Sequence, residues 1–351
     1  ILNPAAETDA HYAKLMAAFY TLSGKAQVTL PSVITVNAIG NNGGGQLNSI
    51  YYLGNNMASG NPESKLVNEA TVNIYGNKVA AVNIDNVQSN GDVTFENRGK
   101  ITGHAQAGTF TDSGGSTLTG ATPQNHVFGA FTYGYSGADR IDNTAQGEVI
   151  FYAPGSAGWA YTAANKQDVK RTATNDGVMR FYGKNSLGIA TDNDTSTTQM
   201  AWADIQLNNP IEIYGDESVG ASFLTEPDTT SSNFLSSKFK INIGGSNLTA
   251  QEAGIGDSKG DASKVQNSVG LNFDFTIRNA GFTDKDIENY YVDLASNSKN
   301  SIAIRNGQAK LTFKDSATSG INLAGEESIG YLSDGATNNR LTYNNTTNKF
   351  E

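Results

Sequence analysis

The sequence predicts an all-β protein whose short strands stack into a β-solenoid. A recurring motif, its near-constant spacing and a composition rich in turn residues support this prediction. The motif reads apolar, aromatic or small, Gly, two polar residues, Ser, apolar and Gly, as at 181–189. Further copies lie at 213–221 and 323–331, with a weaker copy at 74–81. In each copy a short strand enters a glycine turn and a second strand leaves it.

The spacing of the motif indicates a stacked-repeat architecture. The small residue that closes it recurs at steps of 29, 30, 32, 50, 33 and 27 residues. Self-similarity with such a period is typical of solenoids, and the longest step fits one period plus an inserted loop. The positions concerned are Gly129, Gly158, Gly188, Gly220, Gly270, Ala303 and Gly330.

Length and composition agree with this prediction. A chain of 351 residues is oversized for one sandwich, but a solenoid core grows in length because each rung buries only its neighbours. The 38 glycines and abundant Asn, Ser and Thr suit a chain with many turns, and there are only 7 prolines.

The N-terminal region is expected to form a cap. Residues 5–23 carry a helical apolar stripe, and a helix across an open solenoid end would cover unpaired strand edges. We assign residues 1–46, the helix plus first strands, to this cap; a partner-binding helix is the alternative. The stripe consists of Tyr12, Leu15, Met16 and Phe19.

Residues 47–351 are expected to form the array, truncated at its C-terminal end because the strand-like pattern continues to Asn345. Asn143, Asn175 and Asn306 each stand shortly before a predicted strand. Asparagines in register in successive turns can form a side-chain amide ladder.

Polar segments interrupt the rhythm, and in a solenoid such insertions become loops that vary in binding. We expect loops at 108–125, 163–175, 226–236, 246–266 and 280–300.

Charge and cysteine content exclude some classes of function. With 24 basic and 34 acidic residues the net charge is −10, which argues against nucleic acid or an anionic membrane as the partner. The absence of cysteine fits an exported bacterial surface protein, because a disulfide would obstruct export through a pore. No run of about 18 apolar residues predicts a membrane-spanning helix.

No catalytic, cofactor-binding or metal-binding residues are predicted. The run 192–194 starts like a calcium loop but lacks its later ligands, and Asp257 and Asp261 are no better. No nucleophile elbow occurs, and no pair of strand aspartates accompanies Arg278 or Arg305. A zinc site would require the three histidines to converge with carboxylates; these are His11, His104 and His126.

Two surface features have both a structural and a functional interpretation. Asp216-Glu217 and Glu326-Glu327 occupy the same turn position, as solvated charges or as an acidic stripe. A local excess of aromatic residues either fills the core or contacts a protein or glycan; it comprises Tyr133, Tyr135, Trp159, Tyr161 and Trp202.

The segment 97–103 and the rungs at 183–188, 215–220 and 325–330 resemble passenger domains of type V autotransporters. Their Asn-, Gly- and Ile-rich style is most similar to that of large fusobacterial outer-membrane adhesins of the RadD type. The resemblance is one of repeat style over residues 47–351. It implies a right-handed parallel β-helix, export through a C-terminal β-barrel of the same full-length chain, and display on the bacterial outer membrane, facing the extracellular space.

The function expected from these features is that of a non-catalytic, surface-displayed adhesin passenger domain. Its loops would attach to a protein or glycan receptor on a host or bacterial cell, without a cofactor. A secreted β-helix polysaccharide lyase or hydrolase is the alternative from another class, and a secreted, non-catalytic glycan-binding module is a third reading.

Overall fold

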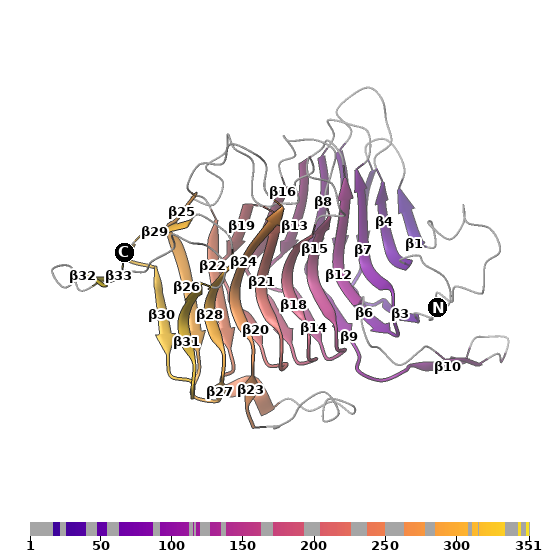
Figure 1. Ribbon diagram of the computed structural model, residues 1–351. Helices are drawn as coiled ribbons and strands as arrows, with labels where there is room; N and C mark the ends of the chain where they lie inside the picture. The colour runs from indigo at the N-terminus through magenta and orange to yellow at the C-terminus, as the bar shows by residue number, and fades with distance from the viewer. Residues whose placement is uncertain are drawn as a thin grey trace.

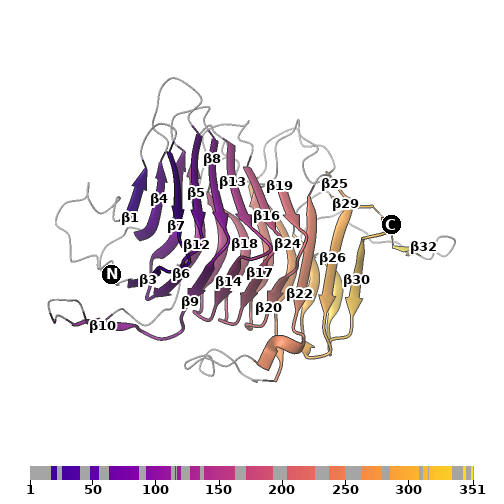
Figure 2. The ribbon, with the colours of Figure 1, turned by 180° about the vertical axis from the view of Figure 1, so that it is seen from behind.

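The protein is a parallel β-helix, seen from two opposite sides in Figures 1 and 2. The computed structural model describes residues 17–21, 26–39, 48–54, 63–86, 92–111, 115, 117–119, 127–134, 138–162, 171–192, 204–225, 237–249, 263–277, 285–307, 311–314, 316–333, 343–344 and 349–350.

One long sheet, called sheet 1, contains ten strands in the described part of the chain, and every neighbouring pair is parallel. Its strands are β1 (Ala17–Thr21), β4 (Asn48–Gly54), β7 (Val79–Asn86), β12 (Val127–Gly134), β15 (Ser156–Thr162), β18 (Leu187–Asp192), β21 (Val219–Thr225), β24 (Val269–Ile277), β28 (Ile302–Asn306) and β31 (Ile329–Ser333).

The second sheet contains fifteen described strands in two rows that meet at β22 (Lys238–Ile243) and continue as β26 (Asn289–Leu294) and β30 (Gly320–Leu323). Row a is β2 (Ala26–Leu30), β5 (Glu63–Asn68), β8 (Asp92–Asn97), β13 (Ala138–Asn143), β16 (Arg171–Asn175) and β19 (Asp204–Leu207). Row b is β3 (Thr35–Ile39), β6 (Thr71–Tyr75), β9 (Lys100–Gly103), β14 (Glu148–Phe151), β17 (Val178–Phe181) and β20 (Ile211–Ile213).

One rung consists of a row a strand, a row b strand and a sheet 1 strand, for example β16, β17 and β18. The predicted parallel β-helix of about ten rungs is therefore confirmed. The step of 50 residues is one period with an insertion, because Val219 in β21 pairs with Val269 in β24.

Short elements lie outside the two long sheets. β10 (Thr109–Thr111) and β11 (Thr117–Thr119) form an antiparallel hairpin, as do β32 (Tyr343–Asn344) and β33 (Lys349–Phe350). β23 (Val265–Gln266) pairs in parallel with β27 (Ser298–Lys299), and β25 (Lys285–Ile287) with β29 (Leu311–Phe313). The 3-10 helix η1 spans Ser246–Thr249.

Period-two alternation places apolar side chains inside the coil and polar ones outside. In β22 the phenylalanine and both isoleucines are buried, whereas the intervening lysines and asparagine are partly exposed. Equivalent core residues stack from rung to rung, as Phe151 does on Phe181 at a ring distance of 5.7 Å. Phe223 stacks on Phe273 in the same way at 5.2 Å. Each rung thus completes the core of the next.

A buried amide ladder follows the ends of the row a strands. The Asn68 Nδ2 donates to Asn97 Oδ1 at 2.9 Å, Asn97 to Asn143 at 2.8 Å, and Asn143 to Asn175 at 2.8 Å. The predicted ladder is confirmed at Asn143 and Asn175. Asn306 is not part of it, because it lies in sheet 1 and donates to the hydroxyl of Tyr331.

The serine of the motif forms a second ladder at the corner between row b and sheet 1. The backbone N–H of Ser186 donates to Ser218 Oγ at 3.0 Å, and that of Ser218 to Ser268 Oγ at 3.2 Å. The residue before each serine has a positive φ, 55° at Asn185 and 54° at Glu217. The two polar positions of the motif thus form a left-handed corner that aims the serine inward.

The closing glycine is required by a close approach between rungs. A Cβ added to Gly188 would lie 2.3 Å from the carbonyl oxygen of Gly220 and 2.7 Å from Ile211 Cγ2. A Cβ on Gly220 would lie 2.4 Å from Ile241 Cγ2. The backbone and an inward side chain therefore fill the space that a larger residue would need.

The predicted N-terminal helix is not observed in the described part of residues 5–23. Residues 17–21 form strand β1, in which Phe19 pairs with Tyr51 and Tyr20 with Tyr52 of β4. The open edge of β4 offers backbone partners, and consecutive aromatic residues favour a strand. Tyr12, Leu15 and Met16 of the predicted stripe lie outside the described residues. Strands β2 and β3, also within 1–46, pair in parallel with β5 and β6.

Several predicted loops contain regular structure. β16 falls within 163–175, and β25, β26 and β27 fall within 280–300. The hairpin β10–β11 occupies part of 108–125, and η1 and β23 occupy part of 246–266. Segment 226–236 lies outside the described residues.

Candidate functional site

A column of five ring side chains runs along the outer corner where row b turns towards sheet 1. The row b register pairs Ile74 with Gly103, Gly103 with Phe151, Phe151 with Phe181, and Phe181 with Ile213, which aligns the residues that follow. We call these residues the aromatic column; they are Tyr75, His104, Tyr152, Tyr182 and Tyr214.

The rings of the aromatic column stack in two groups along the axis of the coil. Tyr75 and His104 have centroids 4.2 Å apart with an interplanar angle of 5°. Tyr152 stacks on Tyr182 at 5.0 Å, and Tyr182 on Tyr214 at 4.9 Å. Tyr182 and Tyr214 are 3% and 2% exposed, whereas the other three are half-buried. The solvent-facing part of the column is therefore its N-terminal part.

Two inserted segments are anchored on this column, and both replace the tight corner between row b and sheet 1. The first carries the hairpin β10–β11, and its Phe110 packs edge-on against Tyr75 at 5.1 Å. The second carries η1, where the Asn247 backbone oxygen accepts a hydrogen bond from the Tyr182 hydroxyl at 3.1 Å. Figures 1 and 2 show β10 and η1 at the same lower side of the coil.

Glu212 is the polar centre at the η1 end of the column. Its Oε2 accepts hydrogen bonds from Arg180 Nε at 2.9 Å, Tyr214 Oη at 2.6 Å and Asn247 Nδ2 at 3.1 Å. Burial raises the pKa of Tyr182 to about 12 and raises that of Tyr214 as well, so both phenols stay neutral at physiological pH. This carboxylate oxygen is used to hold η1 and the rings together.

Amide side chains accompany the other end of the column. Asn73 Nδ2 donates to Asn37 Oδ1 at 3.0 Å, so Asn73 Oδ1 is an acceptor. His104 Nε2 lies 3.1 Å from that oxygen and donates to it. These contacts fix the orientation of the imidazole ring between Tyr75 and the next rung.

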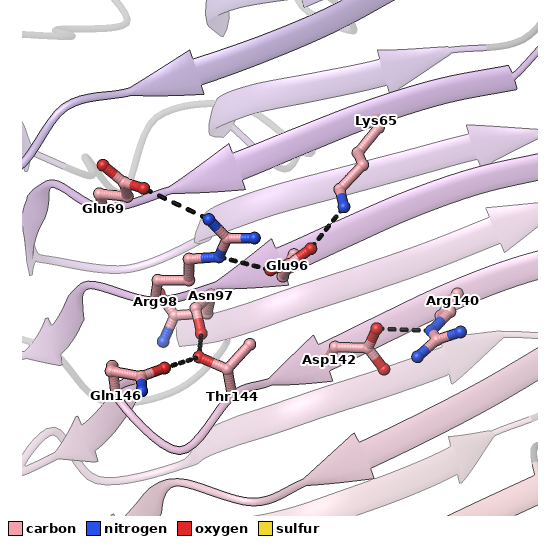
Figure 3. A network of polar contacts seen from close by, with 9 residues as sticks. All are labelled: Lys65, Glu69, Glu96, Asn97, Arg98, Arg140, Asp142, Thr144 and Gln146. Carbon is pink, nitrogen blue, oxygen red and sulfur yellow. Dashed lines mark hydrogen bonds and ion pairs between the residues drawn. The ribbon is translucent and has the colours of Figure 1, made fainter.

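The charges on both rows of the second sheet form ion pairs, some between neighbouring rungs and some within one rung. On row a, Glu96 binds Lys65 at 2.6 Å and Arg98 at 2.5 Å, while Arg140 binds Asp142 at 2.5 Å (Figure 3). Burial would raise the pKa of Glu96, but hydrogen bonds from Lys65 and Arg98 outweigh burial and lower it.

On row b, Lys100 lies 3.3 Å from Glu148, and Arg180 binds Glu212 at 2.9 Å. The Arg180–Glu212 pair lies beside the buried tyrosines of the aromatic column, and the Lys100–Glu148 pair lies at the opposite end of β9 and β14.

The acidic stripe does not form. Asp216-Glu217 and Glu326-Glu327 occupy one column, but Gln266 and Lys299 stand between them in the intervening rungs. Glu326 is bound by Lys264 at 2.6 Å and by Lys299 at 3.2 Å. Hydrogen bonds from these lysines lower the pKa of Glu326, so the edge has mixed charge.

The aromatic residues noted in the sequence take structural places where they are described. Trp159 is 2% exposed and Tyr161 is fully buried, so both belong to the core. Tyr135, Trp202 and the side chain of Tyr133 lie outside the described residues. The sequence reasoning missed the aromatic column, although the second position of the motif marks Tyr75, Tyr182 and Tyr214.

The sequence reasoning also missed a buried ion pair inside the coil. Arg171 Nε lies 3.6 Å from Asp139 Oδ2, with both side chains at most 1% exposed, and the guanidinium lies over the Tyr161 ring at 5.9 Å. Burial lowers the pKa of Arg171, and the Asp139 charge opposes this effect. The pair joins β13 to β16 from within, away from the outer surface.

No family model, curated protein or solved structure matches the chain.

The described residues contain no group of three potential metal ligands. His11, His126, Asn193 and Asp194 of the weighed metal sites lie outside them, as do Asp257, Asp261 and Arg278. Over the same residues no helix is long and apolar enough to cross a membrane.

Proposed function

We propose that the protein is a non-catalytic adhesin module of the autotransporter passenger type, displayed outside the bacterial cell. The observation that carries the proposal is the anchoring of two inserted segments on one aromatic column of a repetitive scaffold. Attachment then occurs through these segments and the column between them.

The scaffold has the properties that display requires. Buried asparagine and serine ladders join successive rungs, and apolar side chains stack along the whole interior. Each rung supports its neighbours, so length is gained without a wider core. Insertions at the corner between row b and sheet 1 leave the ladders intact, which makes this corner suitable for variable binding segments.

An enzymatic role for the same corner has less support. The cluster of Glu212, Tyr182 and Tyr214 is the arrangement closest to an acid–base site among the described residues. However, Glu212 Oε2 accepts three hydrogen bonds within the protein, and burial holds both phenols in the neutral form. A general base needs a free acceptor oriented towards substrate.

Attachment of the labelled chain to host and bacterial cells tests the proposal. Variants lacking residues 108–125 or 250–262 should each bind more weakly, and a variant lacking both should lose most binding. The matched control lacks residues 226–236, which connect β21 to β22 at a different corner. Equal binding by all variants would contradict the proposal, as would release of sugar products from polysaccharide by the intact chain.

A further inference from the structure

We propose that the outer face of sheet 1 is the contact surface of a homodimer, in which two copies of the chain pack face to face. The inference goes beyond attachment at the aromatic corner and does not depend on it. A pair of coils carries two copies of that corner, so pairing raises the avidity for a surface with many receptors.

A column of apolar side chains runs along the outer face of sheet 1. The register of the parallel strands aligns one residue of each rung from β15 to β31. Leu187 shows that this position faces outward, because the next residue, Gly188, faces the interior side chain of Ile211. None of the aligned residues belongs to the apolar core or packs against it. We call this set the sheet 1 column; it consists of Ala157, Leu187, Val219, Val269, Ile302 and Ile329.

The larger side chains of the sheet 1 column reach solvent. Val219, Val269 and Ile302 are partly exposed, and Ile329 is 44% exposed. A second aligned column beside it has short side chains, so the face is flat enough for another sheet to approach. In β15, β18 and β21 this second column consists of Ala160, Ala190 and Ser222.

The outward side chains of the second sheet are of a different kind. In β22 they are Lys238, Lys240 and Asn242, and in β16 they are Thr172 and Thr174. The alternation of the strands therefore does not by itself make an outer face apolar. The aliphatic side chains are a property of sheet 1, and a contiguous exposed apolar patch marks an interaction surface.

Charge selects a second copy as the occupant. From β15 to β24 neither of the two outward columns carries a charged residue, whereas the whole chain has a net charge of −10. Two copies repel each other where their acidic surfaces meet, so an uncharged face is the one on which they approach at least cost. A strongly basic partner finds no complementary charge here.

Size and periodicity suit the same occupant. Ten strands about 4.8 Å apart, with about five residues each at a rise of about 3.3 Å, give a face of roughly 700 Å². Stable interfaces bury about 800 Å² of surface on each partner. An identical sheet repeats its aliphatic residues at the same spacing. The outward side chains of two copies can therefore interdigitate as they do in a β-sandwich, with the sheets about 10 Å apart.

Sedimentation velocity of the whole chain over a range of concentrations tests the inference. We expect a monomer–dimer equilibrium that strengthens with salt, because salt screens the repulsion between acidic copies. Val219→Lys and Val269→Lys should each weaken dimerisation about tenfold or more, because each copy then brings a like charge to the interface. Thr172→Lys is the matched control, since it adds the same charge to the outer face of the second sheet and should leave the dimer unchanged.

The double variant Val219→Thr with Val269→Thr separates association from folding, because it keeps both β-branched shapes. It should keep the wild-type melting temperature and still weaken dimerisation, since its hydroxyls lose water in the interface. Dimers that tolerate both lysines overturn the inference, as does dissociation on addition of salt, which would indicate ion pairs.

A chain that stays monomeric at every concentration also overturns the inference, and a thiol probe then identifies the alternative. The chain has no cysteine, so Val269→Cys introduces a single thiol on the face. Slow reaction of that thiol in the monomer would mean that another part of the chain covers sheet 1. Fast reaction would leave the face open to an unrelated partner. A monomer that still attaches to cells through the inserted segments refutes the dimer and leaves the adhesin function standing.

Discussion

The amide ladder offers the sharpest test of how the rungs are held together. Asn143 is 1% exposed, accepts from Asn97, and donates to Asn175 and to the carbonyl oxygen of Val178. In Asn143→Ala, Asn175 Oδ1 and the Val178 carbonyl oxygen lose this donor, and Asn97 Nδ2 keeps only its 3.3 Å contact with the Glu148 carbonyl oxygen. A buried polar group without a partner costs about 1–3 kcal/mol. The expected loss of unfolding free energy is therefore about 2–4 kcal/mol.

Urea denaturation followed by circular dichroism measures this loss, and hydrogen exchange of β13 and β16 locates it. Asn73→Ala is the matched control, because Asn73 bonds to Asn37 and His104 on the half-exposed outer face, where water can replace it. It should cost less than about 1 kcal/mol. A loss below about 0.5 kcal/mol for Asn143→Ala would refute a structural role of the ladder.

Three further predictions concern close packing, the buried charges and pH. Gly220→Ala should lower the unfolding free energy, measured by denaturant, by about 1–3 kcal/mol, because the added Cβ would lie 2.4 Å from Ile241 Cγ2. Gly320→Ala is the control and should leave the unfolding free energy unchanged, because the nearest atom to its added Cβ is 3.7 Å away. Asp139→Asn should lower the unfolding free energy by about 3–5 kcal/mol, because the buried Arg171 loses the charge of its carboxylate partner. The double change Asp139→Leu with Arg171→Met should recover most of that loss. Additive losses from the two positions would contradict their coupling. Because the folded pKa of Glu96 is lowered, its contribution to stability is complete above pH 4.5, the unfolded value, and is lost as pH falls below it. Glu96→Gln should flatten that acid limb of the stability profile, and an unchanged limb would contradict the assignment.

The fold could be predicted because its tightest contacts demand particular residues. Gly188 and Gly220 each face a backbone oxygen of the next rung. Ser186 and Ser218, two residues before these glycines, form hydrogen bonds from rung to rung. These demands repeat once per rung and so appear as a period in the sequence. Asn143 and Asn175 were found by the same logic.

The errors have a physical cause as well. Apolar residues spaced by three and four near the N-terminus fit a helix, yet Phe19 lies in a strand because the edge of β4 supplies backbone hydrogen bonds. The pairing of Asp139 with Arg171 depends on rung register, which no local pattern reveals.

The aromatic column was missed for a similar reason. His104 and Tyr152 are far apart in the chain and lie on adjacent rungs because β9 pairs with β14. The motif marked Tyr75, Tyr182 and Tyr214 only as aromatic or small, and the insertion that follows His104 hides the period near the start of the column.

Hydrogen exchange of the free chain and of the chain bound to fixed partner cells tests the central claim most directly. Binding at the aromatic corner predicts protection of residues 103–111, of the segment that follows Phe151, and of η1. Sheet 1 strands such as β18 and β21 should exchange as they do in the free chain. Protection confined to the outer face of sheet 1, or to the corner between β21 and β22, would contradict attachment through the inserted segments and the column.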